Sequence, residues 1–363
     1  MKLHKGRDFR PFLYLMLCGF PIVGVCQTDR QLTFMLDSFN YSEATSLHSI
    51  SGHWSDTVSA GNEAISVSRI TLGYQDKNYS VQAIVRDDTY YRFDNETAQF
   101  IYQIENSIPL ENGQNFALFI KPDKSSSKGF RFGIDTEVSQ NLKLAGFISL
   151  LRPTNLIQGS LVGQAVALDT NDYDFNFTTD LVYEDDPLFD RTTDSLSGKG
   201  YSIDLIIDYM ISENWSLNLQ LLDVMGELKI DEAGYTRADA TSDIKVFDEN
   251  GYLQYDPVIT GKESYKDFVY QFEMQTHLSL AYQMSNKNSL VLQHHRIFDF
   301  EYQKFVFLQS NNQNQLSWSL IPQLKAAGFS FKHPNFSFGI ETDSLNYKKM
   351  KYLNLNTQFY WTF

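Results

Sequence analysis

The sequence predicts an all-β protein, a transmembrane antiparallel up-and-down β-barrel of about fourteen strands, with twelve to sixteen strands possible. Segment 353–363 alternates apolar and polar residues, which is typical of a strand with different surroundings on its two faces. Aromatic residues make up 15% of the chain although its mean hydropathy is only −0.32. Beyond residue 26 no apolar run approaches the roughly 18 residues of a membrane helix. Together these features favour strands that face lipid on one side and a lumen on the other.

The last strand is the clearest element. Its apolar face consists of Leu353, Leu355, Phe359, Trp361 and Phe363, and Thr357 is the one polar residue on that face. Asn354, Asn356, Gln358 and Thr362 lie on the other face with Tyr360. A tilted strand of about eleven residues is long enough to cross a bilayer. We expect Phe359, Trp361 and Phe363 to lie in an interfacial aromatic girdle and to act as a membrane-insertion signal.

The same periodicity, followed back from a C-terminus on the periplasmic side, predicts the other strands. The predicted strands are 31–41, 62–74, 79–92, 97–108, 114–121, 129–137, 142–151, 199–210, 215–228, 264–283, 289–309, 316–332, 336–343 and 351–363. Short turns then fall on the periplasmic side, and the long loops 152–198 and 229–263 fall on the extracellular side. An even strand number is what bacterial single-chain barrels require.

Residues 1–26 are expected to be a cleaved signal peptide, and residues 27–363 a single barrel domain. Four Lys/Arg residues precede an apolar run that Pro21 interrupts. A membrane anchor and lipidation at Cys26 are the alternatives. Both cysteines lie in this segment, which has a net charge of +3, so its removal takes the formal charge from −14 to −17. Such an acidic surface argues against nucleic acid as a partner.

The loop 152–198 holds an apolar stretch, 156–168, that needs to be buried. It could fold into the lumen as a constriction, or it could extend the wall, in which case 155–168 could add a strand. Farther along, Asp172, Asp174 and Asn176 have a calcium-loop spacing, but Phe177 replaces the glycine that the turn needs. A solvated acidic loop is favoured, and we expect no metal site.

Charged residues on the lumen face differ between the two halves of the chain. We expect the pore to be lined by basic Arg69, Arg86, Arg131 and Lys143 from the first half and by acidic Asp204, Asp208 and Glu273 from the second. Opposed basic and acidic walls would create a transverse field that favours polar solutes. Ordinary salt bridges within the lumen would explain the pattern equally well.

The sequence indicates no enzyme and no cofactor. His294 and His295 form an obvious pair, but neighbouring residues of a strand face opposite sides and cannot serve one substrate. No Gly-x-Ser-x-Gly motif and no phosphate-binding glycine-rich loop are present.

The leader, the alternating strands and the aromatic terminal strand resemble those of bacterial outer-membrane β-barrel proteins, porin-like or long-chain fatty acid transporter-like. That transporter family carries an N-terminal plug, where residues 27–60 here are short and mostly polar. The resemblance implies a Gram-negative outer membrane, export through the periplasm, and contact with outer-membrane lipid, lipopolysaccharide and the barrel assembly machinery. The expected function is a porin-like or facilitated channel for small solutes. The alternative is a non-conducting surface or scaffold barrel whose loops bind a partner or support an envelope assembly.

Overall fold

The computed structural model describes residues 30–52, 54, 56–186, 188, 191, 193, 195–242, 259–311 and 313–363, and the backbone of 245–247, 253–255 and 258. The predicted signal peptide with both cysteines lies outside the described residues. So do Asp190 and Asp194 of the acidic segment.

The described strands close into a fourteen-stranded antiparallel barrel. Its first half consists of β1 (Arg30–Ser42), β2 (Glu63–Asp76), β3 (Tyr79–Phe93), β4 (Asn115–Ser139), β5 (Leu142–Ala167), β6 (Tyr173–Tyr183) and β7 (Ser197–Met210). The rest consists of β8 (Trp215–Thr241), β11 (Val258–Gln271), β12 (Gln275–Gln283), β13 (Asn288–Ile297), β14 (Phe300–Ser310), β15 (Gln315–Ile321), β16 (Ala326–His333), β17 (Phe336–Thr342) and β18 (Tyr352–Thr362). The ring closes where β18 pairs with β1, from Gln31↔Thr362 to Tyr41↔Tyr352. A small separate hairpin pairs β9 (Lys245–Phe247) with β10 (Leu253–Tyr255).

Two of the fourteen barrel strands are interrupted. β6 and β7 both run between β5 and β8, so they are two parts of one barrel strand. β11 and β12 both pair with β8 and are separated by only 272–274, so they form another. The predicted count of fourteen is therefore confirmed.

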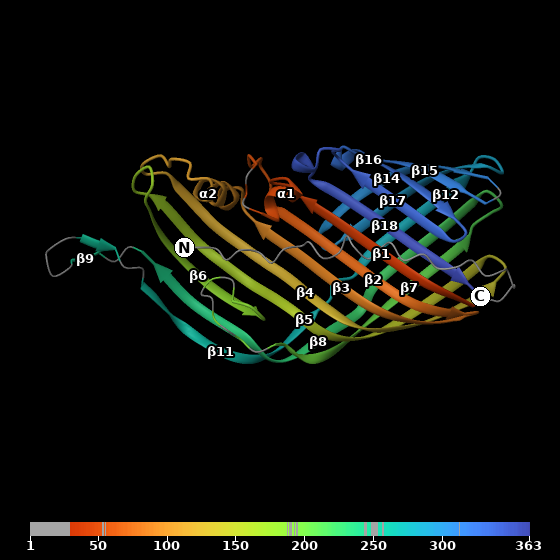
Figure 1. The fold of residues 1–363 in the computed structure, drawn as a ribbon, viewed down its shortest axis with the longest axis horizontal. Coiled ribbons are helices and arrows are strands. Elements are labelled where there is room, and N and C mark those ends of the chain that lie inside the picture. The colour runs from red at the N-terminus through yellow and green to blue at the C-terminus, as the bar shows by residue number, and fades with distance from the viewer. Residues whose placement is uncertain are drawn as a thin grey trace.

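The barrel has two unlike ends (Figure 1). At the end that we call the terminal end, short turns join neighbouring strands, and Arg30 lies beside Phe363. At the other end, the crown, lie α1 (Leu47–Ile50), α2 (Asn95–Glu105), η1 (Pro322–Leu324) and η2 (Tyr347–Lys349). β4, β5 and β8 have 25 to 27 residues, whereas β13 to β18 have 7 to 11, so the long strands extend the crown on one side of the barrel.

Several predicted strand boundaries were wrong. Two predicted strands are lost and two others each divide into two strands, so the total number of strands is unchanged. Segment 97–108 is mostly the helix α2, because Asp94 caps its N-terminus by accepting from the Thr97 amide, and Phe100 and Ile104 pack on one face. Segments 114–121 and 129–137 belong to one strand, β4. Pro122 lies inside that strand, and Ser125 and Ser127 there are almost fully buried.

Two other predicted strands are in fact hairpins. Segment 289–309 turns at Phe298 and Asp299 between β13 and β14, and 316–332 turns at η1 between β15 and β16. The turns contain no Asn-Gly or Asp-Gly pair, the strongest short signal of a hairpin, so each segment was predicted as one continuous strand. Arg296 keeps the regular register opposite Glu301, beside the first turn at the crown. It therefore lies at the rim of the barrel.

The predicted long loops 152–198 and 229–263 are largely strand. Residues up to 167 extend β5, and residues up to 241 extend β8. The apolar stretch 156–168 thus extends the wall and does not fold into the lumen as a constriction; Leu156 is completely buried against its neighbours. The residues proposed for a calcium-loop spacing lie in the turn and first part of β6. No group of three potential metal ligands occurs in the described part of the chain.

We call the part of the barrel formed by β13 to β18 the short wall, and its outward face is apolar and exposed. Leu292 is 44% exposed and Phe305 is 51% exposed, whereas Gln293 and Lys304 beside them in the sequence line the lumen. Exposed aromatic residues collect at the terminal end: Tyr79, Tyr209, Trp215, Tyr282, Phe336, Trp361 and Phe363. An apolar band with an aromatic girdle is the surface of a transmembrane barrel. No described helix is long and apolar enough to cross a membrane.

Candidate functional site: a polar cavity in the lumen

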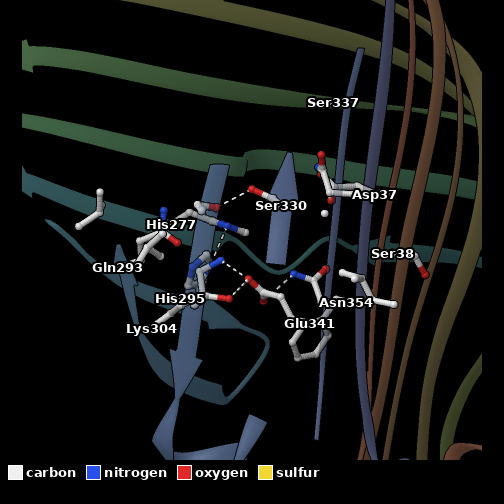
Figure 2. A pocket seen from close by; sticks show the side chains of 18 of the residues that line it. Asp37, Ser38, His277, Gln293, His295, Lys304, Ser330, Ser337, Glu341 and Asn354 are labelled. Carbon is white, nitrogen blue, oxygen red and sulfur yellow. Dashed lines mark hydrogen bonds and ion pairs between the residues drawn. The ribbon is translucent and has the colours of Figure 1, made fainter. Parts of the chain in front are cut away.

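The lumen of the barrel contains a cavity of about 430 Å³ (Figure 2). It is lined from β8 round the short wall to β2, and most of its lining side chains are polar. Gln315, Lys332 and Ser337 line it beside the short turns of the terminal end, whereas Ile297 and Tyr302 line it near the crown. The cavity therefore runs along most of the height of the short wall.

An aromatic and aliphatic cluster closes the crown end of this cavity. Phe39 stacks on Tyr302 with ring centroids 5.7 Å apart, and Tyr352 meets Phe39 edge-on at 5.7 Å. Phe298, in the β13–β14 turn, folds inward and stacks on Tyr90 at 5.0 Å. We call this cluster the cap. Its buried members are Phe39, Ile65, Val67, Tyr90, Ile297, Phe298, Tyr302, Ile321, Ala326 and Tyr352.

Two histidines lie directly below the cap. Nδ1 of His295 lies 2.9 Å from Nδ1 of His277 on the neighbouring strand, and the His295 ring stacks on Tyr302 at 4.7 Å. The register pairs these two histidines directly across β12 and β13. His294 faces outward instead and lies 3.9 Å from Glu301. The two adjacent histidines thus face opposite sides, as predicted, while the pairing of His277 with His295 was missed.

An ion pair and its hydrogen bonds join β14, β15, β17 and β18 on the cavity side of the short wall. Lys304 Nζ donates to Glu341 at 2.9 Å, and both side chains are 12% exposed. Ser319, Tyr352 and Asn354 also donate to the Glu341 carboxylate, at 3.1, 2.9 and 3.1 Å. This carboxylate is therefore held in place by four donors from β14, β15 and β18.

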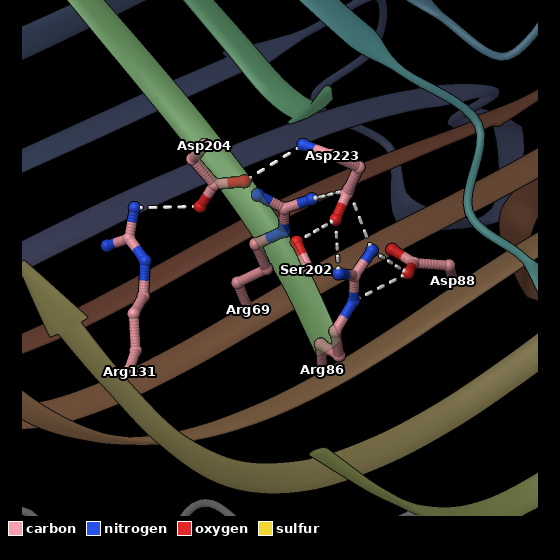
Figure 3. Close-up of polar contacts among 7 residues, drawn as sticks. All are labelled: Arg69, Arg86, Asp88, Arg131, Ser202, Asp204 and Asp223. Atoms are coloured by element: carbon pink, nitrogen blue, oxygen red, sulfur yellow. Dashed lines mark hydrogen bonds and ion pairs between the residues drawn. The ribbon is translucent and has the colours of Figure 1, made fainter. Parts of the chain in front are cut away.

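A second polar feature bridges the lumen beside the cavity (Figure 3). Arg69 of β2 and Arg86 of β3 both donate to Asp223 of β8, at 2.8 and 2.7 Å, although four barrel strands separate β2 from β8 along the wall. Arg86 also donates from Nε to Asp88 at 2.8 Å. Arg131 of β4 donates to Asp204 of β7 at 2.9 Å. We call Arg69, Arg86, Asp88, Arg131, Ser202, Asp204 and Asp223 the cross-lumen network.

The cross-lumen network is electrically balanced. It joins three guanidinium groups to three carboxylates, and Ser202 and the Asp223 amide donate the further hydrogen bonds that fix it. Asp223 has no exposed side-chain surface, and Arg86 has only 3%. Charges so deep in a protein are tolerated because each is paired and hydrogen-bonded. The basic and acidic residues meet and neutralise one another, and they do not form two opposed charged walls.

A bulge in β8 places Asp223 in the network. Its φ of 56° is in the left-handed region, and the pairing of β7 with β8 shifts between Ile203 and Leu205. Between the terminal end and the bulge, Leu219 and Leu221 face outward, so strict alternation along β8 would place Asp223 outward as well. The bulge turns the Asp223 side chain into the lumen instead. Periodicity in the sequence therefore could not have found Asp223, whereas Asp88 has the same parity as Arg86 and could have been found.

The predicted pore-lining residues fall into three places. Arg69, Arg86, Arg131 and Asp204 come together in the cross-lumen network. Lys143 and Asp208 face each other across β5 and β7 near the terminal end, where Lys143 pairs with Glu137 at 2.5 Å and Asp208 accepts from Asn218 at 2.7 Å. Glu273 lies exposed in the break between β11 and β12, apart from both groups.

The predicted terminal girdle lies where the periodicity placed it. Asn354 and Asn356 line the cavity, while Phe359 stacks with Trp361 at 5.9 Å and with Phe336 of β17 at 6.5 Å on the other face. Trp361 is 47% exposed and Phe363 is 52% exposed. Their role as an insertion signal stays a prediction.

The fold and the lumen define a class: a transmembrane β-barrel of the outer-membrane type with a capped polar cavity. No family model and no curated protein matches the chain. Among solved structures it is similar to a TodX deltaS2S3 mutant, a monoaromatic hydrocarbon channel, with a TM-score of 0.46, 10% identity and coverage of 92% of this chain and 90% of that one.

Two further solved structures show a weaker likeness. The Pseudomonas putida toluene transporter TodX has a TM-score of 0.41 and 9% identity, with 93% and 89% of the chains covered. A Pseudomonas aeruginosa FadL homologue has a TM-score of 0.33 and 6% identity, with 91% and 87% covered. At such low similarity the function has to be inferred from this chain's own residues.

Proposed function

We propose that this barrel lies in the outer membrane of a Gram-negative bacterium and carries small solutes through its lumen without catalysis. Short turns are typical of the periplasmic side of such barrels and longer connections of the extracellular side. The terminal end would then face the periplasm and the crown the outside. The chain would reach this place by export through the periplasm after loss of residues 1–26.

The observation that carries this proposal is the position of the polar cavity. It runs along the short wall from residues beside the periplasmic turns up to the cap. A barrel that served only as a scaffold would have no need of a long polar cavity, whose buried polar groups cost free energy unless they are satisfied. The cavity is therefore best understood as part of a path for solutes.

The cap and the cross-lumen network indicate a facilitated channel that is closed at rest, not a wide porin. The cap closes the crown end, and the network occupies the lumen between β2, β3 and β4 on one side and β7 and β8 on the other. Beside the network, apolar residues of β3, β5, β6, β8, β11 and the break after β11 pack into a buried cluster; they are Ile84, Leu151, Leu156, Val182, Leu228, Ile230, Ala233, Tyr270 and Phe272. A solute must therefore displace the cap to pass.

Swelling of proteoliposomes in isotonic glycerol tests the proposal. The folded barrel, verified by its heat-sensitive gel mobility, should swell the liposomes faster than protein-free liposomes do. A matched pair of variants localises the path: Val306→Trp places an indole in the cavity, whereas Phe305→Trp places one on the outward face of the same strand. We expect the first to slow swelling several-fold and the second to leave it unchanged.

The scaffold alternative predicts the opposite. If folded wild-type barrel gives no more swelling than protein-free liposomes, the channel proposal is wrong and a non-conducting barrel is supported. If both tryptophan variants swell like wild type, solutes do not use this cavity.

A further inference from the structure

The histidine pair below the cap has hydrogen-bonding capacity that the protein does not use. His295 is only 8% exposed, and both His277 and His295 line the cavity. Their Nδ1 atoms bond to each other, but both Nε2 atoms are buried without a hydrogen-bond partner in the described part of the chain. Buried polar atoms normally have partners, so a pair of unpartnered Nε2 atoms at one end of a cavity indicates a ligand.

The tautomers of the pair determine what such a ligand must offer. A hydrogen bond between two Nδ1 atoms needs one ring to carry the proton there and the other to accept it. In neutral imidazoles, the donating ring then has a lone pair on Nε2, and the accepting ring has an N–H on Nε2. The pair therefore has one unused acceptor and one unused donor, each on an Nε2 atom.

Two other side chains extend this pattern. Nε of Arg69 is a donor and Oε1 of Gln293 is an acceptor; both atoms are buried and lack a partner among the described residues, and both side chains line the cavity. The cavity thus offers two donors and two acceptors. A hydroxyl group can donate and accept at once, so a solute with several hydroxyl groups would satisfy all four.

The charges around the cavity favour an uncharged solute. Lys304 is paired with Glu341, and Arg69 is paired with Asp223. The Asp37 carboxylate accepts from Asn356 at 3.0 Å and keeps acceptor capacity for a hydroxyl. Among the described lining residues, the two charges without an ion pair are Asp37 and Lys332, one negative and one positive, so the cavity has no net charge that would attract an ion.

We infer that the crown end of the cavity is a binding site for an uncharged polyhydroxy solute of monosaccharide size, centred on His277 and His295. This inference rests on the proposed channel function and specifies its substrate class. A cavity of about 430 Å³ is within the range of small-molecule sites. The site also adjoins the cap, since His295 stacks on Tyr302 and Tyr302 stacks on Phe39, so an occupant would contact the closing element.

Equilibrium dialysis with radiolabelled D-glucose, together with glucose uptake by proteoliposomes, tests the inference. Wild-type barrel should bind glucose saturably, and His277→Leu/His295→Leu should weaken binding at least tenfold. The matched control is His294→Leu, which changes the outward-facing histidine of the same strand and should bind like wild type. Gln293→Leu, a milder change at the same site, should weaken binding several-fold and replaces the double variant if that one does not fold.

The outcomes separate this inference from the proposed function. If wild-type barrel passes glycerol and glucose but the histidine and Gln293 variants bind and transport glucose unchanged, the site assignment is overturned while the channel stands. If toluene, added as competitor, displaces glucose at equal concentration, the polar selectivity is overturned as well. If wild-type barrel passes neither solute, the channel itself is refuted.

Discussion

Arg86 and Asp223 lie on strands that are far apart along the wall of the barrel, β3 and β8, yet their side chains meet inside the lumen at 2.7 Å. This contact joins the two halves of the barrel interior and is the centre of the cross-lumen network. Because Asp223 also binds Arg69 and Ser202, one carboxylate holds three side chains from three strands.

Replacing this carboxylate should destabilise the barrel. Asp223→Asn leaves Arg69 and Arg86 without their shared counter-charge in a buried site, a type of change that costs about 3–5 kcal/mol. We expect a lower urea midpoint for unfolding in lipid vesicles, measured by tryptophan fluorescence. Asp208→Asn is the control, because Asp208 is exposed and its one side-chain hydrogen bond among the described residues comes from Asn218, so its midpoint should stay near that of wild type. Equal midpoints for both variants would show that the network does not support the fold.

Truncating the cap should open the crown end. Phe298 is 4% exposed and stacks on Tyr90, so Phe298→Ala removes a ring that helps to close the lumen. We expect faster swelling of proteoliposomes in glycerol, by a factor of several. Phe305→Ala removes a ring of the same size from the outward face and should not change the rate. A Phe298→Ala barrel that folds but swells no faster would mean that the cap is not a barrier.

The position of the membrane band can be tested by the depth dependence of an arginine substitution. Leu292 lies on the outward face in the middle part of β13, and arginine at the bilayer midplane costs about 2–4 kcal/mol in such barrels. Gln309→Arg, near the terminal end of β14, should cost about 0–1 kcal/mol, as expected close to an interface. The free energy of unfolding in vesicles should therefore be clearly lower for Leu292→Arg than for Gln309→Arg. Similar values would place the band elsewhere.

The terminal aromatic residue should matter more for insertion than for stability. Phe363 is exposed at the end of β18, so Phe363→Ser removes no core packing. We expect a reduced yield of folded barrel in outer-membrane fractions, with an unchanged unfolding midpoint for the molecules that do fold. Phe336→Ser changes another exposed aromatic of the same end and is the control. A normal yield for Phe363→Ser would refute the insertion-signal role.

Much of the barrel was predictable because lipid and lumen impose opposite requirements on alternate residues. The parity of β18 and the outward face of β7 follow directly from this rule, since Asn354 and Asn356 line the cavity and Tyr209 is exposed. The rule fails where the backbone departs from regular alternation. Phe268, Tyr270 and Phe272 pack inward, whereas Leu278 and Leu280 of the same barrel strand face outward, because the break at 272–274 reverses the parity.

The candidate site was predicted only in part, for the same reason. Arg69, Arg86, Arg131 and Asp204 have inward parity and were found, but their pairing depends on contacts across the lumen that no local pattern encodes. Asp223 depends on a bulge. His277 and His295 have inward parity, yet only the register of β12 against β13 shows that they meet.

The central claim is that the lumen is a solute path closed at rest by the cap and the cross-lumen network. Single-channel recording of the folded wild-type barrel in a planar bilayer tests it most directly, beside Phe298→Ala. We predict that wild type stays closed with rare, brief openings and that the variant shows frequent current steps. A large, steady conductance of the wild-type barrel would contradict the account, because it would require a lumen that neither the cap nor the network closes.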